Sequence, residues 1–118
     1  MSEVWKYRAD QELPSFAGDW YDGDEELLDL STGWTFSAQL VDAIEGTVAA
    51  TISSGITGAA VSPNIVVAWA NGALATAFGT RTRTRDFELH IKATNGASAD
   101  RFYRPDEEVI VRISPVPT

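Results

Sequence analysis

Regular alternation of apolar and polar residues is the feature of this sequence that most constrains its fold. Residues 34–40 read WTFSAQL, so the apolar side chains from Trp34 to Leu40 occupy every second position. Residues 86–92 read DFELHIK and repeat the pattern around Phe87, Leu89 and Ile91. Because successive side chains of a strand point to opposite faces, this spacing predicts strands with one buried face and one exposed face.

Further segments carry strand patterns of the same or a related kind. In residues 47–52 we expect Val48, Ala50 and Ile52 to face inward, and residues 42–46 have the length and glycine of a hairpin loop. Residues 64–69 read NIVVAW, an almost continuous apolar run that is typical of a central strand. A last strand is expected at residues 108–113, and shorter strands on either side of Leu13-Pro14.

The segment 71–79 does not fit a strand, because it is rich in alanine and bracketed by glycines. It predicts a single helical turn or a crossing loop, with Gly79 after its end. The whole pattern predicts an all-β fold, an immunoglobulin-like antiparallel β-sandwich with at most one short helical turn around residues 71–78. The length of 118 residues predicts one domain, residues 1–118, in which residues 1–15 form an extended N-terminal arm or an edge strand.

The net charge of −8 is unevenly distributed along the chain. Residues 1–31 contribute −7, residues 32–80 contribute −2 from Asp42 and Glu45, and residues 81–118 contribute +1. Phosphate backbones are bound by clustered Lys and Arg, so the composition argues against nucleic acid as a partner.

Other bulk properties exclude several classes of protein. The chain has no cysteine, which excludes disulfides, thiolate metal sites and cysteine nucleophiles. No apolar run approaches the roughly 18 residues that span a bilayer, so we expect no membrane association. The N-terminal residues lack the basic and then apolar layout of a signal peptide, so we expect synthesis in a cytoplasm.

Two features could suggest a metal or catalytic site. The run 19–26 (DWYDGDEE) is acidic, but its glycine is misplaced for a calcium loop, and a solvated hairpin tip explains it better. His90 is the single histidine, and alternation places it outward between Glu88 and Lys92, where cross-strand pairing is its expected role. We therefore predict no catalytic, cofactor-binding or metal-binding residues.

Arg81, Arg83 and Arg85 form a basic stripe that alternates with threonines. A continuous strand would place these arginines on the same face as Phe87, where unpaired charges are very costly. We therefore expect a break near Arg85, with residues 80–84 in an exposed loop or edge. The acidic N-terminal third could neutralise the stripe, within the chain or from a neighbouring subunit, which makes the arginines candidates for partner contact.

The N-terminal segment also holds Trp5, Tyr7, Trp20 and Tyr21, with few apolar neighbours. These aromatic residues could stack on sugars, pack against a partner protein or close the end of the sandwich. The sequence has no Gly-rich phosphate loop, no Gly-x-Ser-x-Gly elbow and no His-Glu-x-x-His zinc motif. We expect a protein that is not an enzyme.

Short motifs along most of the chain resemble small structural proteins of tailed bacteriophages. The residues that carry the resemblance are RADQELP at 8–14, DGDEELLDLSTGWTFSAQLVD at 22–42 and FELHIKAT at 87–94, followed by a final Val/Ile strand and proline. In this order they are similar to the N-terminal β-sandwich of baseplate upper proteins and to short minor tail proteins of actinobacterial phages. The Arg/Thr tract between Gly79 and Phe87 departs from the pattern of that family.

The resemblance implies a virion component, made in the host cytoplasm, that assembles through contacts with copies of itself and with other virion proteins. It implies no catalytic residues. Two alternatives remain open at this point. One is a β-sandwich module that binds a carbohydrate or a host receptor through exposed aromatic residues. The other is a capsid decoration protein, which would share the fold class and differ in its place in the particle.

Overall fold

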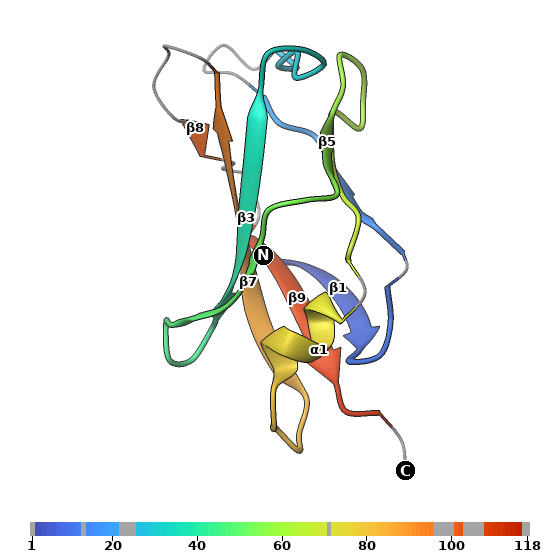
Figure 1. The fold of residues 1–118 in the computed structure, drawn as a ribbon, viewed down its shortest axis with the longest axis vertical. Coiled ribbons are helices and arrows are strands. Elements are labelled where there is room, and N and C mark those ends of the chain that lie inside the picture. The colour runs from blue at the N-terminus through green and yellow to red at the C-terminus, as the bar shows by residue number, and fades with distance from the viewer. Residues whose placement is uncertain are drawn as a thin grey trace.

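The computed structural model describes residues 2–12, 14–21, 26–70, 72–95, 101–102 and 108–116. The chain has an all-β, sandwich-like fold with one short helix among the described residues (Figure 1). Its elements, in chain order, are β1 (Ser2–Arg8), β2 (Phe16–Gly18), β3 (Thr35–Asp42), β4 (Val48–Ile52), β5 (Ile56–Gly58), β6 (Ile65–Val67), α1 (Ala73–Phe78), β7 (Arg85–Thr94), β8 (Arg101–Phe102) and β9 (Glu108–Ser114).

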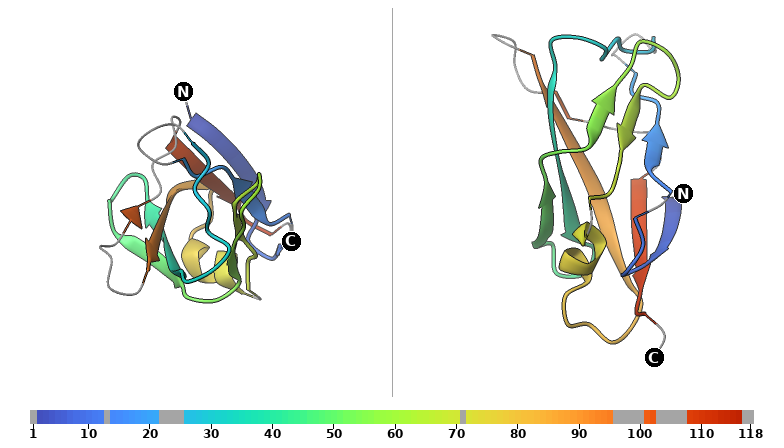
Figure 2. Two further views of the ribbon diagram at one scale, coloured as in Figure 1. Left: turned by 90° about the horizontal axis from the view of Figure 1, so that it is seen from above. Right: turned by 45° about the vertical axis from the view of Figure 1, so that its right-hand side comes forward.

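The strands form two sheets that pack against each other. The larger sheet has the order β1-β9-β7-β3-β4, and β8 pairs with β7 beyond the end of β9. The smaller sheet has the order β2-β6-β5. The small sheet covers one part of the large sheet and α1 covers the other, as the two views of Figure 2 show.

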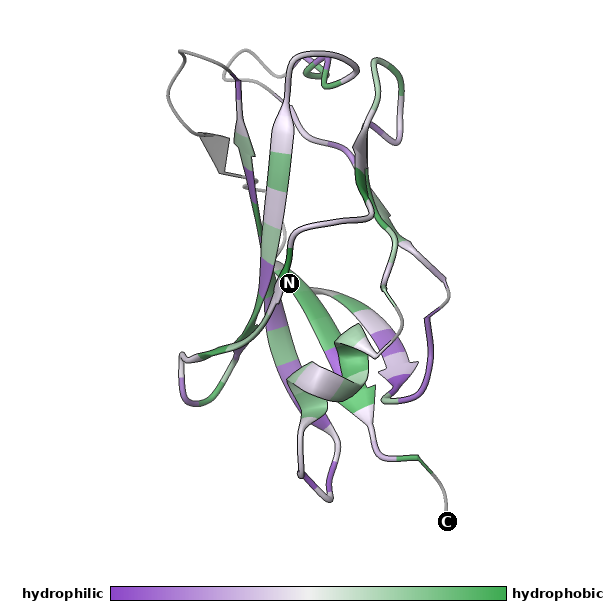
Figure 3. Ribbon diagram, in the orientation of Figure 1, coloured by the Kyte–Doolittle hydropathy of each residue, from purple (hydrophilic) through white to green (hydrophobic). Residues whose placement is uncertain are grey.

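The predicted alternation is confirmed in the two longest strands. Phe87, Leu89 and Ile91 of β7 are buried, as are Ala38 and Leu40 of β3. Apolar and polar bands alternate along both strands in Figure 3. Trp34, just before β3, and Phe36 are only partly buried, because they pack at the margin of the core.

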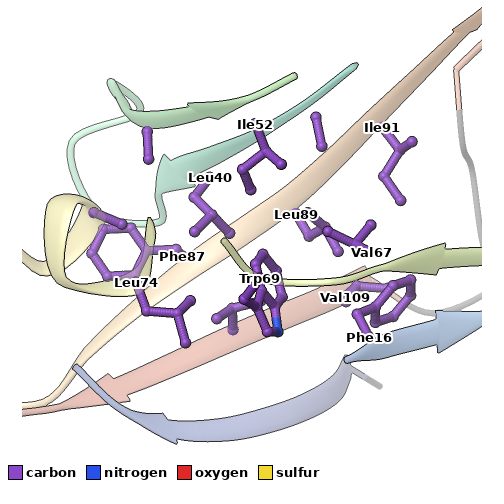
Figure 4. Close-up of a cluster of buried hydrophobic side chains, with 14 of the residues drawn as sticks. Phe16, Leu40, Ile52, Val67, Trp69, Leu74, Phe87, Leu89, Ile91 and Val109 are labelled. Atoms are coloured by element: carbon purple, nitrogen blue, oxygen red, sulfur yellow. The ribbon is translucent and has the colours of Figure 1, made fainter. Parts of the chain in front are cut away.

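The core lies between the two sheets and under α1. Its side chains come from both sheets and from the helix, and they converge in Figure 4. The predicted central strand is confirmed, because Ile65, Val67 and Trp69 are all buried and β6 is the middle strand of its sheet. Leu74 of α1 is also fully buried, and Gly79 follows the helix with a φ of 64°.

The inward position predicted for Val48 is wrong. A bulge between Leu40 and Val41 shifts the register of β3 and β4 by one residue, so Val48 pairs with Val41. Val48 therefore leaves the inner row of Ala50 and Ile52, and it is 52% exposed. A register shift depends on two strands at once, so the alternation of one strand could not reveal it.

The pairing of the first and last strands differs from the predicted antiparallel arrangement. β1 runs parallel to β9 along its whole length, from Ser2 opposite Glu108 to Arg8 opposite Ser114. These strands stand at the two ends of the described chain, so no tight turn fixes their relative direction. Strand β1 is the last strand on its side of the large sheet.

The segment that leads into β3 is a turn held by its own side chains. The Asp29 carboxylate accepts hydrogen bonds from the Ser31 amide at 3.0 Å and from the Ser31 hydroxyl at 2.6 Å. These bonds lower the pKa of Asp29. The Trp34 indole N–H donates to the Asp29 carbonyl at 3.1 Å, and Gly33 adopts a φ of 81°.

Candidate partner-binding surface

A buried ion cluster occupies the end of the sandwich at the β3–β4 hairpin. The Asp42 side chain at the end of β3 is fully buried. Arg85 Nε and Nη2 donate to the two Asp42 carboxylate oxygens at 3.0 and 2.8 Å, and Arg81 Nη2 donates at 2.8 Å. The hairpin amides of Ile44 and Glu45 also donate to this carboxylate, at 2.8 and 3.0 Å.

These bonds keep the Asp42 carboxylate ionised at low pH. The bonds from Arg85 hold the pKa of Asp42 well below its usual range, although burial acts in the opposite direction. Arg81 also donates to the carbonyls of Ala77 and Phe78 at 3.2 and 3.0 Å, which satisfies the last turn of α1. One carboxylate thus ties together the hairpin, the helix end and the start of β7.

The arginine stripe is neutralised by a different residue from the one that the sequence analysis expected. Strand β7 begins at Arg85, and residues 80–84 are a loop, as predicted. The carboxylate that neutralises Arg81 and Arg85 is Asp42, which lies outside the acidic N-terminal third. Arg83 is exposed and forms no ion pair with any residue that the structure describes, so it alone of the three stays available for a partner.

Two of the four N-terminal aromatic side chains belong to the core. Tyr7 is 3% exposed, its hydroxyl donates to the Pro14 carbonyl at 2.7 Å, and its ring meets Trp69 edge-to-face at 5.7 Å. Burial raises the pKa of Tyr7. Trp20 is 4% exposed, and its backbone N–H and C=O both bond to the buried Asn64 amide. Neither ring can present a face to a partner in this conformation.

The other two aromatic residues retain exposed surface to different degrees. Trp5 is partly buried and packs edge-to-face on Phe16, with the ring centroids 5.2 Å apart. Tyr21 is 54% exposed and makes an isolated bridge with Leu27. This bridge flanks the predicted hairpin tip, whose residues 22–25 lie outside the described residues.

The acidic turn and the histidine gather no cluster suited to metal or acid–base chemistry among the described residues. Asp19 accepts a hydrogen bond from the Ser62 hydroxyl at 2.6 Å. His90 is exposed on the outer face and lies 3.5 Å from Glu88 on its own strand. The part of the chain that the structure describes contains no group of three His, Cys, Asp or Glu side chains that could hold a metal ion.

A mostly apolar row crosses the outer face of the large sheet, with Glu88 at its centre and two apolar side chains on either side. The registers place Val4, Ile110, Glu88, Val41 and Val48 side by side on consecutive strands from β1 to β4. Val41 and Ile110 are nearly covered, but Val4 at one end is 38% exposed and Val48 at the other end is 52% exposed. Sequence reasoning missed this row, because it exists only once the strands are in register.

The edge strand β4 is the second surface that the sequence analysis did not single out. Strand β4 ends the large sheet, and Figure 2 shows it on the outside with no described strand beyond it. The tract 46–80, which includes β4, β5, β6 and α1, contains no Asp, Glu, Lys or Arg. Strand edges in natural proteins are commonly protected by charges, and β4 has none.

The other edge of the large sheet is charged, and the β5 edge of the small sheet is covered. Strand β1 carries Lys6 and Arg8 on its outward face, and both are exposed. Beyond the end of β5, the Ala59 carbonyl accepts a hydrogen bond from the Leu30 amide at 3.1 Å, so a neighbouring segment covers that side of the small sheet. The uncharged edge of β4, with the exposed Val48 and the Ile44 side chain at 77% exposure, is therefore the best candidate for a protein contact.

No protein-family model matches the chain, and no curated protein matches its sequence. The described residues contain no helix long and apolar enough to cross a membrane.

Proposed function

We propose that this chain is a non-catalytic structural subunit that works by binding other protein subunits, and that the assembly is a tailed-phage virion. The observation that carries the proposal is the uncharged open edge of β4 on a chain with a net charge of −8. Buried contacts between proteins are depleted in charged residues, which is the composition of this edge. The likeness of residues 8–14 and 22–42 to tail and baseplate proteins supports the choice of particle.

The compact framework also supports a subunit role. Asp42 fixes the hairpin next to β4 through two arginines and two backbone amides, so the edge is held in one shape before any partner binds. A preorganised edge loses little conformational entropy when it binds. Arg83, on the loop before β7, is a candidate for a peripheral charged contact.

The test is mass spectrometry of purified phage particles from cells that carry the gene. We expect peptides of this chain in the particles, in the tail fraction after tails and capsids are separated. Detection in the capsid fraction would instead favour the decoration-protein alternative. Absence from every particle fraction, with the chain present in the lysate, would contradict the proposal.

A carbohydrate-binding module remains the second candidate, because Tyr21 offers an exposed ring. Glycan-array binding that is lost in Tyr21→Ala would favour it. The burial of Tyr7 and Trp20 leaves fewer rings for such a site than the sequence suggested.

A further inference from the structure

We propose that β4 pairs antiparallel with β4 of a second copy across a two-fold axis, so that the large sheet continues from one subunit into the other. The proposal rests on the proposed subunit function and names the partner as the chain itself. Because the edge would meet its own image, the contact is isologous and closes as a dimer.

The absence of charge on β4 favours a second copy of the chain as its partner. Two chains that each carry −8 repel each other, and the repulsion is smallest where the approaching surfaces hold no charge. The segment that contains β4, residues 46–59, has no charged side chain, so two identical edges meet without placing like charges opposite each other. The same approach through β1 would bring together two strands that each carry the cations Lys6 and Arg8.

The register of β4 suggests where the axis passes. Beyond the bulge, β4 forms a regular ladder with β3 at Ala50, Thr51 and Ile52. Thr51 is the middle residue of this ladder, and its side chain is exposed. An axis through Thr51 places Thr51 opposite Thr51 of the second copy and Ala50 opposite Ile52. Cross-strand threonine pairs form hydrogen bonds, and alanine opposite isoleucine fits an inner face.

The two edges of the large sheet also predict the size of the assembly. Of its two described edge strands, β4 carries no charge and β1 carries Lys6 and Arg8. Pairing through β4 therefore leaves a β1 strand at each outer end of the joined sheet, and growth stops at two copies. This predicts a closed dimer rather than a filament.

The first experiment measures mass by analytical ultracentrifugation over a concentration series up to about 100 μM, where complexes of modest affinity form. We expect the purified chain to show twice its monomer mass of 12.8 kDa. Thr51→Glu with Ser53→Glu should weaken the dimer at least about 100-fold, because like charges then lie along the pairing edge. Both positions are exposed, so the variant should keep its fold, which circular dichroism checks.

Lys6→Glu is the matched control, because it also changes the net charge from −8 to −10, by replacing one positive charge with one negative charge. On the β1 edge it should change the dimer affinity less than about threefold, through general repulsion alone. Equal weakening by both variants would overturn the β4 contact, and so would a purified chain that stays monomeric over the whole series.

The second experiment uses the absence of cysteine from the natural sequence. A directly opposite pair has Cα atoms about 4.5–5.5 Å apart, within the range of a disulfide. Thr51→Cys should therefore oxidise to a covalent dimer, visible on a non-reducing gel. Thr57→Cys, an exposed threonine on β5, should stay monomeric. Equal crosslinking of both variants would contradict the axis.

These results separate the inference from the proposed function. A dimer that crosslinks at Thr51→Cys but is absent from phage particles would support the β4 contact and contradict the virion role. A chain that is present in particles but monomeric in solution would overturn the β4 pairing and leave the virion role standing.

Discussion

The two edge strands of the large sheet differ in charge, which affects whether a further strand can pair with each of them. Strand β1 ends the sheet on one side and exposes Lys6 and Arg8, and β4 ends it on the other side with no charged residue. Both edges expose one valine of the apolar row, Val4 on β1 and Val48 on β4. Charge rather than apolar exposure therefore distinguishes the two edges, and it marks β4 as the side where a partner can add.

The ion pairs near the two edges also differ, in how far they are exposed to solvent. Asp42, which ends β3 beside β4, is fully buried between Arg81 and Arg85. Asp86 accepts bonds from Arg112, the neighbour of Lys6 in the sheet, at 2.7 and 3.0 Å, and both side chains are more than a third exposed. The side with the uncharged edge thus has the buried ion cluster, and the charged edge has the solvated pair.

The largest effect is expected from breaking the buried cluster. Asp42→Asn leaves two arginines without their carboxylate and should lower the free energy of unfolding by about 3 kcal/mol. Asp86→Asn is the matched control and should cost less than about 1 kcal/mol, because water screens the exposed pair. Urea denaturation followed by tryptophan fluorescence measures both. Similar losses in the two variants would show that Asp42 is not held as described.

The contribution of Asp42 to stability should also appear when the pH is lowered. The folded-state pKa of Asp42 lies below that of the unfolded chain, so its ionised form stabilises the fold above about pH 4, the unfolded value. That stability is lost as the pH falls further. Wild type should therefore lose more stability than Asp42→Asn between pH 7 and pH 3, in urea midpoints. Asp29 and Asp86 titrate in both proteins, so the difference between the two losses reports Asp42.

The sequence predicted those parts of the fold that depend on one strand at a time. Alternation placed Phe87, Leu89 and Ile91 inward, and the apolar run placed β6 in the middle of its sheet. It could not predict the Asp42 cluster, because the arginines lie 39 and 43 residues further along the chain. The apolar row and the bulge depend on register between strands, which no single segment encodes.

The candidate surface was less predictable than the fold. The aromatic residues Tyr7 and Trp20 were chosen for having few apolar neighbours in sequence. In space, Trp69 packs against the Tyr7 ring and the Asn64 side chain binds the backbone of Trp20, and both residues flank β6. The absence of charge from residues 46–80 was a usable signal for the open edge. This signal can be assigned to a sheet edge only when β4 is known to end the sheet.

Removing the charges from β1 should turn it into a second open edge. Lys6→Thr with Arg8→Thr keeps residues that favour strands and makes the net charge −10, two units more negative. General repulsion alone would reduce association, whereas an unprotected edge should promote it. We expect species larger than a dimer to appear at about tenfold lower concentration than for wild type, by light scattering. Unchanged or weaker association would mean that these charges do not protect β1.

The smallest effect on folding is expected at Val48. Val48→Thr keeps the branched shape on a half-exposed edge residue, so the free energy of unfolding of the monomer should change by less than about 0.5 kcal/mol. Val111→Thr is the matched control on β9, where the side chain is fully buried, and burial of a hydroxyl there should cost about 1–3 kcal/mol. Urea denaturation at a concentration too low for dimers compares the two. A loss at Val48 as large as that at Val111 would mean that Val48 packs in the core of the monomer, as alternation alone predicted, and that the bulge does not turn it to the surface.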